Sequence, residues 1–456
     1  MPEHLRKFRY GWSSWLILVI AFITVFFHRL SVGAVSDVLV QEIPMNSLVL
    51  GNLTAMNYYA YALMQIPVGI LVDRVGVRQI NLLGLLITAG GSLMFGLAHT
   101  IEVAYFARFL VGIGTSVIIV SIFKIQITWF PLSRFSTLSG FTSFFGNFGS
   151  LLAIYPLSYL TLILGWRQIF YLMAGISLFL VLLTFWGVRD RDTLTPLSLK
   201  KTRLSPSFAK AKTAGCTYAI CQKFILSVSI KNSILPQPET PSSFFPYLKQ
   251  SLKSVLGNPK TWPNVLVLFS YTGSSTTLLG LWGIPLLMRI YDLNKSSAAG
   301  YLTYTTFGFI LAAPLVSLIA KWVGGNRRTL LLATGSNFLL WIYITVISQG
   351  HPPLQLFPIL FFLFGILIMF HLLAFSNVTA VNSLQYSGIA TAITNMGEFI
   401  GSSLASLAIG FILDQGWAAS LAWWVILIMA GLSFTGALLM SEETIPIPAV
   451  VSQAKA

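Results

Sequence analysis

Two arginines and one glutamate stand inside long apolar stretches and are the best candidates for chemistry in this sequence. Arg29 follows His28 in FFHRLSVGAV, Arg108 opens RFLVGIGTS, and Glu398 lies in ITNMGEFIGSS. An ionisable side chain in apolar surroundings is costly unless it faces a cavity or a partner, so each one indicates a functional site. A guanidinium binds a carboxylate or a phosphate through two parallel hydrogen bonds. Arg29 therefore predicts an anion-binding site.

Glu398 is the candidate for proton exchange. Burial disfavours the charged form of a carboxylate and a nearby guanidinium favours it, so such a residue can gain or lose a proton as its cavity wets or accepts substrate. His28 and His371 are alternative proton carriers in other apolar stretches. The competing interpretation is a fixed structural pair between Glu398 and an arginine or backbone groups.

Neutral polar residues predict the rest of a cavity wall. Residues three or four positions apart share one face of a helix. By this spacing Gln65 joins Tyr61, and Asn395 joins Glu398, while Tyr271 and Trp282 offer a further face. The same side chains could equally hold helices together or lie at a membrane interface. The candidate substrate-binding residues are Arg29, His28, Tyr61, Gln65, Tyr271, Trp282, His371 and Asn395.

The composition indicates which elements position these residues. Of 456 residues, 55% are hydrophobic and only 9% are charged, whereas roughly a quarter are charged in a soluble protein. Apolar runs near the roughly 20 residues that cross a bilayer predict twelve spans in two groups of six. They lie at 13–35, 48–71, 79–98, 103–127, 137–163 and 168–187, and at 263–289, 298–322, 329–348, 355–378, 389–412 and 418–440.

These runs predict an all-α membrane protein with twelve transmembrane helices in two six-helix bundles. The predicted domains are an N-terminal bundle at 1–188, a cytosolic linker at 189–262, a C-terminal bundle at 263–441 and a cytosolic tail at 442–456. Cys216 and Cys221 lie in the linker, where a lone C-x4-C spacing is a weak indication of metal and free thiols are expected.

The net charge of +15 reflects topology and not nucleic-acid binding. Most lysines and arginines fall on segments that share one side of the membrane with the N-terminus, which by the positive-inside rule places both termini in the cytosol. A basic linker at 189–262 that binds anionic lipid is the remaining alternative. The first apolar run has the length of a full span without a cleavage site, so a cleaved signal peptide is not expected.

Several stretches resemble motifs of the major facilitator superfamily of secondary transporters. GILVDRVGVRQ at 69–79 resembles its loop signature G-x-L-x-D-R-x-G-x-R. RFLVGIGTS at 108–116, WFPLSRFSTLSG at 129–140 and GWRQIF at 165–170 resemble later motifs in the expected order. PLVSLIAKWVGGNRR at 314–328 aligns with the first loop, as an internal repeat predicts, but has lost the aspartate. The resemblance covers nearly the whole chain except 190–260 and implies two bundles that rock around a central site.

The resemblance also implies roles for particular residues. The loop would stabilise the outward-facing state as a conformational latch built from Gly69, Asp73, Arg74, Gly76 and Arg78. The alternative is that these charges only fix topology. Arg108 matches an arginine that faces the cavity and helps handle protons, so Arg108 joins Glu398 as a candidate for proton coupling.

One stretch bears on the substrate. HRLSVGAV at 28–35 resembles the first-helix pattern of organic-anion carriers within the superfamily, where an arginine holds the substrate. Organic-phosphate antiporters have a second arginine midway along helix seven, where this chain has LFSYTGSSTTLLGLWG. A carboxylate is therefore favoured over a phosphate ester.

We therefore expect a proton-coupled secondary transporter of a small organic anion. Its partners would be the substrate, protons and the lipid bilayer, without nucleic acid, metal or cofactor. We expect it to work as a monomer in a bacterial inner membrane. The alternatives are an efflux carrier for amphipathic compounds, favoured by 14% aromatic residues, and a receptor that does not transport. The sequence has no nucleotide loop, metal cluster or nucleophile with its base, so an enzyme is not expected.

Overall fold

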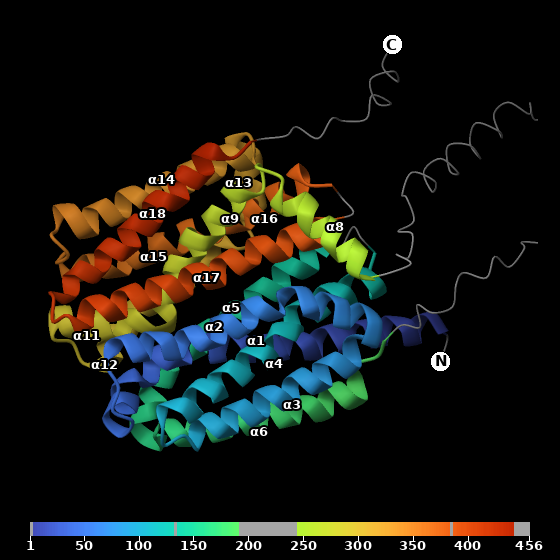
Figure 1. The fold of residues 1–456 in the computed structure, drawn as a ribbon, viewed down its shortest axis with the longest axis horizontal. Coiled ribbons are helices and arrows are strands. Elements are labelled where there is room, and N and C mark those ends of the chain that lie inside the picture. The colour runs from blue at the N-terminus through green and yellow to red at the C-terminus, as the bar shows by residue number, and fades with distance from the viewer. Residues whose placement is uncertain (1–2, 132–134, 191–243, 384–385, 442–456) are drawn as a thin grey trace, which may run out of the picture. The chain divides into compact units, whose positions relative to one another are not determined.

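The computed structural model describes most of the chain (Figure 1). The described residues are 3–131, 135–190, 244–383 and 386–441. Most of the predicted linker with its two cysteines, and the predicted tail at 442–456, lie outside the described residues. Of the described residues, those at 3–131, 135–190, 254–383 and 386–441 group into one compact unit, within which all the contacts reported below are found.

The first half of the chain forms six long helices. They are α1 (Glu3–Glu42), α2 (Ser47–Val75), α3 (Val77–Gly96), α4 (Ile101–Trp129), α5 (Phe135–Leu164) and α6 (Trp166–Gly187). Each is as long as the predicted span or longer, and α1 extends the predicted 13–35 at both ends. The predicted boundaries therefore located all six helices. They underestimated the length of every helix except α3, because further residues continue these helices beyond the apolar core.

The second half contains more helical pieces, because several of its helices are interrupted. After α8 (Phe244–Leu256), they are α9 (Trp262–Val267), η4 (Leu268–Thr272), α10 (Gly273–Thr277), η5 (Leu278–Trp282), α11 (Gly283–Tyr291), α12 (Lys295–Ala312), α13 (Val316–Val323), α14 (Asn326–Ile342), η6 (Tyr343–Ile347), η7 (Leu354–Leu356), α15 (Phe357–Ile368), η8 (Met369–His371), α16 (Leu372–Val381), α17 (Ser387–Asp414), η10 (Ala419–Leu421) and α18 (Ala422–Leu439). No strand occurs among the described residues.

The described helices account for the twelve predicted spans. Ten of those searched are long and apolar enough to cross a membrane, and the bent pair α12 and α13 makes an eleventh. The remaining span corresponds to α2, whose 29 residues suffice in length but include asparagines, tyrosines and a glutamine that make it less apolar. Large side chains such as Trp186 and Trp322, which are 75% and 77% exposed, fit contact with lipid rather than water.

One predicted span is broken. The run at 298–322 was predicted as a single helix, but α12 and α13 meet at an angle of 67°. The break contains Pro314, which has no amide hydrogen to donate and whose ring clashes with the preceding turn. The bend could therefore have been predicted from Pro314.

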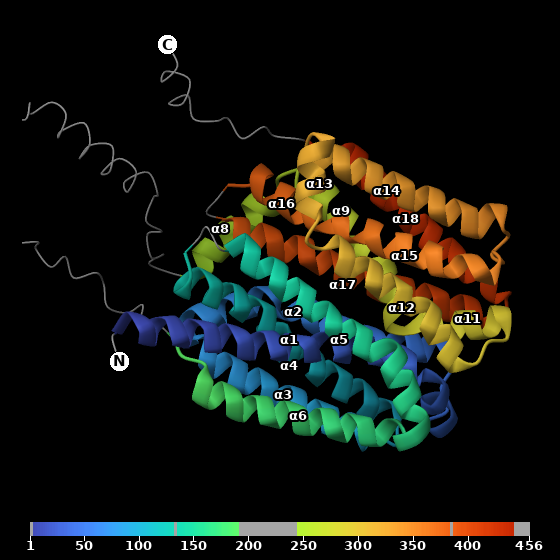
Figure 2. The same ribbon diagram turned by 180° about the vertical axis from the view of Figure 1, so that it is seen from behind.

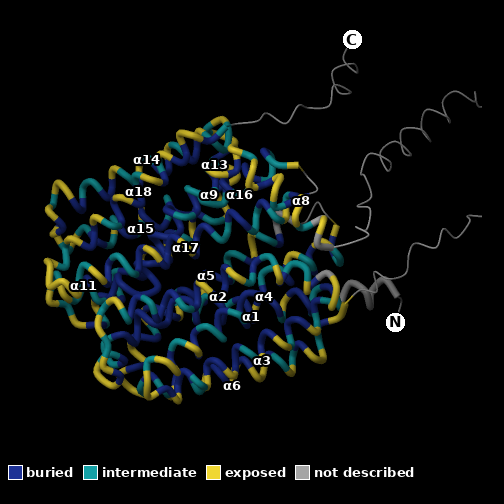
Figure 3. The backbone as a smooth tube through the Cα atoms, in the orientation of Figure 1, coloured by how far each residue is buried: buried dark blue, intermediate teal, exposed yellow. Residues whose placement is uncertain are grey.

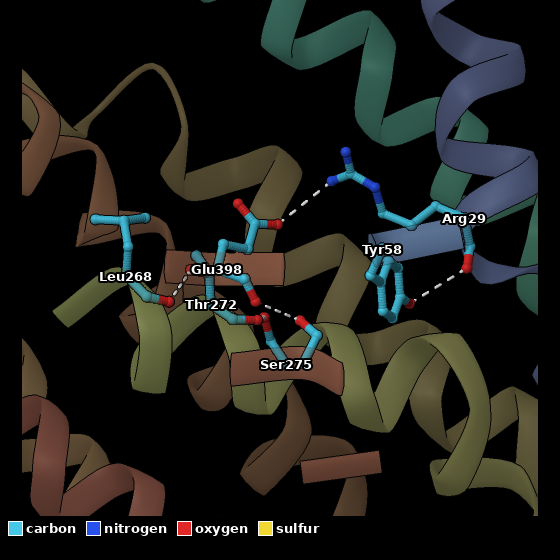
Figure 4. Close-up of polar contacts among 7 residues, drawn as sticks. Arg29, Tyr58, Leu268, Thr272, Ser275 and Glu398 are labelled. Atoms are coloured by element: carbon cyan, nitrogen blue, oxygen red, sulfur yellow. Dashed lines mark hydrogen bonds and ion pairs between the residues drawn. The ribbon is translucent and has the colours of Figure 1, made fainter. Parts of the chain in front are cut away.

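Helix seven is widened at two places. The helix from Trp262 to Tyr291 contains the π-helical segments η4 and η5 on either side of α10. The hydroxyl of Thr272 donates to the carbonyl of Leu268 over 2.6 Å, and that of Ser275 to the carbonyl of Thr272 over 2.9 Å (Figure 4). Such hydroxyls supply alternative bonds for the backbone, and π turns often mark functional positions.

The two halves meet along α2 and α17, which lie side by side in both views (Figures 1 and 2). The positions along their shared surface are buried, whereas exposed residues concentrate on the outer helix faces and at the connections (Figure 3). On the opposite side of α17, Gly401 lies directly against the backbone of Phe269 in helix seven. The absence of a side chain at Gly401 is what permits this close approach.

We expect Gly401→Ala to destabilise the fold by about 1 to 3 kcal/mol, because the added methyl group would overlap the carbonyl oxygen of Phe269. Thermal unfolding of the purified protein in detergent would measure the effect. Gly175→Ala in α6 is the matched control, since nothing lies within 4 Å of the position of its added carbon. Equal melting temperatures for the two variants would contradict the close packing of α17.

Candidate functional site

The centre of the candidate site is an ion pair between the two halves. The Arg29 guanidinium in α1 lies 3.3 Å from the Glu398 carboxylate in α17 (Figure 4). Each residue is only 9% exposed. Both were singled out from the sequence, and the structure brings them into direct contact. A buried ion pair is strongly destabilised when one partner is removed, because the other charge is then uncompensated.

Aromatic rings surround the guanidinium. The Arg29 Cζ atom lies 5.2 Å from the ring centroid of Phe26, 5.1 Å from that of Tyr61 and 4.9 Å from that of Phe399. Cations within about 6 Å of a ring face are attracted by the ring's quadrupole, most strongly where water is excluded. Of these rings only Tyr61 was predicted from the sequence. The other two rings, Phe26 and Phe399, were not predicted from the sequence.

Two further residues of α2 complete this part of the site. The hydroxyl of Tyr58 donates to the backbone carbonyl of Arg29 over 3.4 Å. The side-chain amide nitrogen of Gln65 is buried without a hydrogen-bond partner among the described residues. Gln65 follows Tyr61, whose ring contacts Arg29, by one turn of α2.

Arg108 and His28 form a second buried group beside the ion pair. A terminal nitrogen of Arg108 donates to the backbone carbonyl of His28 over 2.9 Å. The other two guanidinium nitrogens and both ring nitrogens of His28 have no partner among the described residues. Arg108 therefore fixes the backbone of α1 next to Arg29, and its predicted part in proton coupling stays a prediction.

His371 in η8 and Asn395 in α17 are partly buried. Nδ1 of His371 is 2.9 Å from the carbonyl oxygen of Ile368, and the imidazole lies within electrostatic range of Glu398. Asn395 precedes Glu398 by one turn of α17. Contact of either residue with substrate stays a prediction.

The polar groups of Tyr271 and Trp282 form hydrogen bonds to neighbouring helices. The Tyr271 hydroxyl donates to the carbonyl of Leu367 over 2.6 Å, and the Trp282 indole nitrogen donates to the carbonyl of Ser406 over 2.9 Å. Both side chains are buried in the second half. These bonds match the interhelical role considered above, so substrate binding by either residue would require the bonds to break.

The loop of the predicted latch is held within the first half. Gly76 has φ = 100°, a conformation that favours glycine. The backbone amide of Val77 donates to the carboxylate of Asp190 over 2.7 Å, and that of Arg78 donates to the same carboxylate. A carboxylate at the start of α3 is favoured by the unpaired amides and the helix dipole. The role of Asp190 was not predicted, because it lies 113 residues from the amide of Val77 that it accepts from.

The remaining latch residues lie near this cap. The Arg78 guanidinium donates to the carbonyl of Phe185 over 2.5 Å and lies 4.7 Å from its ring centroid. Arg74 is exposed, and nothing lies within 4 Å of a side-chain carbon added at Gly69. The side chain of Asp73 lies outside the described residues. A latch between the halves therefore stays a prediction.

Charged contacts join the halves at the far end, where α1 connects to α2 and α17 to α18. The Lys295 ammonium at the start of α12 lies 2.7 Å from the carboxylate of Asp37 in α1. The carboxylate of Asp414 accepts from the backbone amides of Ser47 over 2.6 Å and Leu48 over 2.8 Å. These two contacts, which we call the far-end contacts, were not predicted. The first contact joins α1 to α12, and the second joins α17 to α2.

These features define an integral multi-pass membrane protein with a buried polar site between two halves. The sequence profile of the Major Facilitator Superfamily matches residues 17–406. The chain therefore belongs to the Major Facilitator Superfamily, as the motifs predicted.

Individual relatives agree with this family. An uncharacterized transporter of Bacillus subtilis (strain 168) is 21% identical over 412 residues, which cover 89% of this chain and 81% of the relative. A probable L-galactonate transporter of Escherichia coli (strain K12) is 22% identical over 418 residues, covering 88% and 83%. The crystal structure of a D-xylose–proton symporter matches with a TM-score of 0.65 at 14% identity, covering 96% of this chain and 99% of that chain. The chain is thus a membrane transporter and not an enzyme.

Proposed function

We propose that the protein transports a small organic anion together with a proton and that a carboxylate of the substrate binds Arg29. The observation that carries this proposal is the Arg29–Glu398 pair, because it joins the two halves at a buried point. Because the guanidinium of Arg29 already binds the Glu398 carboxylate, it has the geometry to bind a substrate carboxylate in its place. The name of the probable L-galactonate transporter, which specifies a sugar-acid anion, supports the same substrate class.

The chemistry of the pair links anion binding to proton binding. When the substrate carboxylate takes the place of Glu398 on Arg29, the Glu398 carboxylate loses its counter-charge in a site with little water. An unpaired charge in such a site is costly, and proton uptake removes that cost. Binding of one substrate carboxylate therefore favours binding of one proton. Release of the substrate restores the pair and expels the proton.

Alternating access follows if the bundles at 1–188 and 263–441 rock about this site. The far-end contacts close one approach to Arg29. Toward the opposite end, Ile66 in α2 and Met396 in α17 are only partly buried. We therefore assign this conformation to a state that admits substrate from the end at which α1 begins and α18 ends. With the predicted topology, that side of the bacterial inner membrane faces the cytosol. One chain contains both bundles, so we propose that a monomer suffices for transport.

Glu398→Gln should abolish accumulation driven by a pH gradient while preserving anion binding. In the wild type, binding should strengthen by up to about tenfold for each unit of falling pH, because the bound anion requires a protonated Glu398. Glutamine is neutral at every pH, so the variant's affinity should not change with pH. Proteoliposomes offered L-galactonate, D-glucarate and short-chain mono- and dicarboxylates, with lumenal pH recorded, would measure transport. Equilibrium binding across the pH range would measure affinity.

The matched control is Glu102→Gln, which removes an exposed carboxylate in the first turn of α4. This variant should retain the wild-type pH dependence. Continued accumulation by Glu398→Gln in response to a pH gradient would refute proton coupling through Glu398. Transport of lipophilic cations without any carboxylate would favour the efflux carrier instead.

A further inference from the structure

Phe399 is a side chain of the second half that lies in the core of the first half. Its residue is only 1% exposed, and it packs in a hydrophobic cluster whose other buried members all belong to α1–α6 or their connections. Met396, one turn earlier in α17, packs against the same cluster from its edge. α17 therefore inserts one aromatic ring across the interface between the halves.

The ring is placed against groups that already belong to the candidate site. Its centroid lies 4.4 Å from that of Tyr61 and 6.2 Å from that of Tyr58. It also lies 4.9 Å from Cζ of Arg29, nearer than the rings of Phe26 or Tyr61. Tyr61 and Phe399 thus form two adjacent surfaces for the guanidinium, one contributed by each half.

We propose that Phe399 is a positioning residue that holds the Arg29 guanidinium in the orientation that binds a substrate carboxylate. This inference rests on the proposed function, because it gives Phe399 a part in binding the same anion. The attraction of the cation by the ring leaves the nitrogen atoms of the guanidinium available for hydrogen bonds. A guanidinium fixed in this way loses less conformational entropy when it binds an anion.

The position of Phe399 next to Glu398 links the positioning of Arg29 to the movement of the second half. Glu398 and Phe399 are consecutive residues of α17, and both contact Arg29. A movement of the second half that withdraws Glu398 must therefore withdraw the ring as well. Arg29 is positioned for binding only while α17 lies against α2, so anion affinity depends on the conformation of the transporter.

Ring fluorination at position 399 is the test, since fluorine weakens the quadrupole of the ring and leaves its shape nearly unchanged. Phenylalanine with one, two or three fluorine atoms would be incorporated at position 399 of the full-length protein. Binding would be measured for L-galactonate, D-glucarate and the short-chain carboxylates named above. We expect the dissociation constant of the tightest-binding carboxylate to rise with each fluorine. Phe399→Leu, which lacks the ring, should raise it by about 3- to 30-fold.

Phe361→Leu is the control for lost packing, because Phe361 is equally buried in the second half and contacts Phe357 instead of the site. It should bind the carboxylate as the wild type does. A dissociation constant that stays the same across the fluorinated series would overturn the role of Phe399 and leave the proposed function intact. Failure of the wild type to bind any carboxylate of the panel would overturn the proposed function itself.

Discussion

Arg29→Ala should weaken carboxylate binding by about 30- to 3000-fold, corresponding to about 2 to 5 kcal/mol for the loss of one partner of a buried charged pair. The substrate carboxylate loses its hydrogen-bonded counter-charge, and the Glu398 carboxylate, 3.3 Å from the guanidinium in the wild type, is left unpaired. Arg29→Lys retains the charge but not the planar pair of donors. It should therefore bind the anion at least about tenfold more weakly than the wild type.

Equilibrium binding and counterflow exchange in proteoliposomes would measure these losses. Arg289→Ala is the matched control, because Arg289 is an exposed arginine in the last turn of α11 and should leave affinity unchanged. The double variant Arg29→Ala/Glu398→Gln should bind no more weakly than Arg29→Ala alone, since the two residues act on each other directly. Wild-type affinity in Arg29→Ala would exclude Arg29 from the substrate site.

The ion pair illustrates what the sequence could and could not predict. An arginine and a glutamate inside apolar stretches are conspicuous, because such residues are costly there without a partner. Their mutual contact joins positions 369 residues apart, and no local pattern specifies such a pairing. The residue types and their depth were predictable, and the partners were decided by how the two halves pack.

The helices show the same division between local and tertiary information. Twelve apolar runs were found because span length is a property of the local sequence. The break between α12 and α13 was also local, since Pro314 marks it. The widened turns η4 and η5 were not predicted, because one additional residue in a turn hardly alters an apolar pattern.

The missed site residues are ordinary by type and acquire their roles from position. Phe399 is one of 34 phenylalanines, and only its packing against both Tyr61 and Arg29 distinguishes it. Asp190 and Asp414 are acids beside connections between helices, where charged residues are common. Each accepts hydrogen bonds from amides at the start of a helix that lies far away in the sequence. Capping by a distant residue carries no signature of the kind that local capping residues provide.

The far-end contacts should determine how readily the transporter opens on that side. The Asp37–Lys295 pair joins α1 to α12, and Asp414 of α17 caps the start of α2. Both contacts run between the halves, so both must break when the halves separate at this end. Each should contribute about 1 kcal/mol or somewhat more, because water screens the exposed Asp414 while Lys295 is buried.

The double variant Lys295→Ala/Asp414→Asn should therefore shift the equilibrium toward the far-end-open state by about 30- to 150-fold, or about 2 to 3 kcal/mol. Spin labels at Val103 in the first half and Leu421 in the second, both exposed, would report the separation by pulsed electron resonance. The matched control is Glu42→Gln. Glu42 forms a 2.9 Å ion pair with Arg167 at the same end but within one half. Loss of this ion pair should leave the distribution of distances between the two spin labels unchanged, since the pair does not have to break when the halves separate. If the double variant kept the wild-type distribution as well, neither far-end contact would hold the halves together.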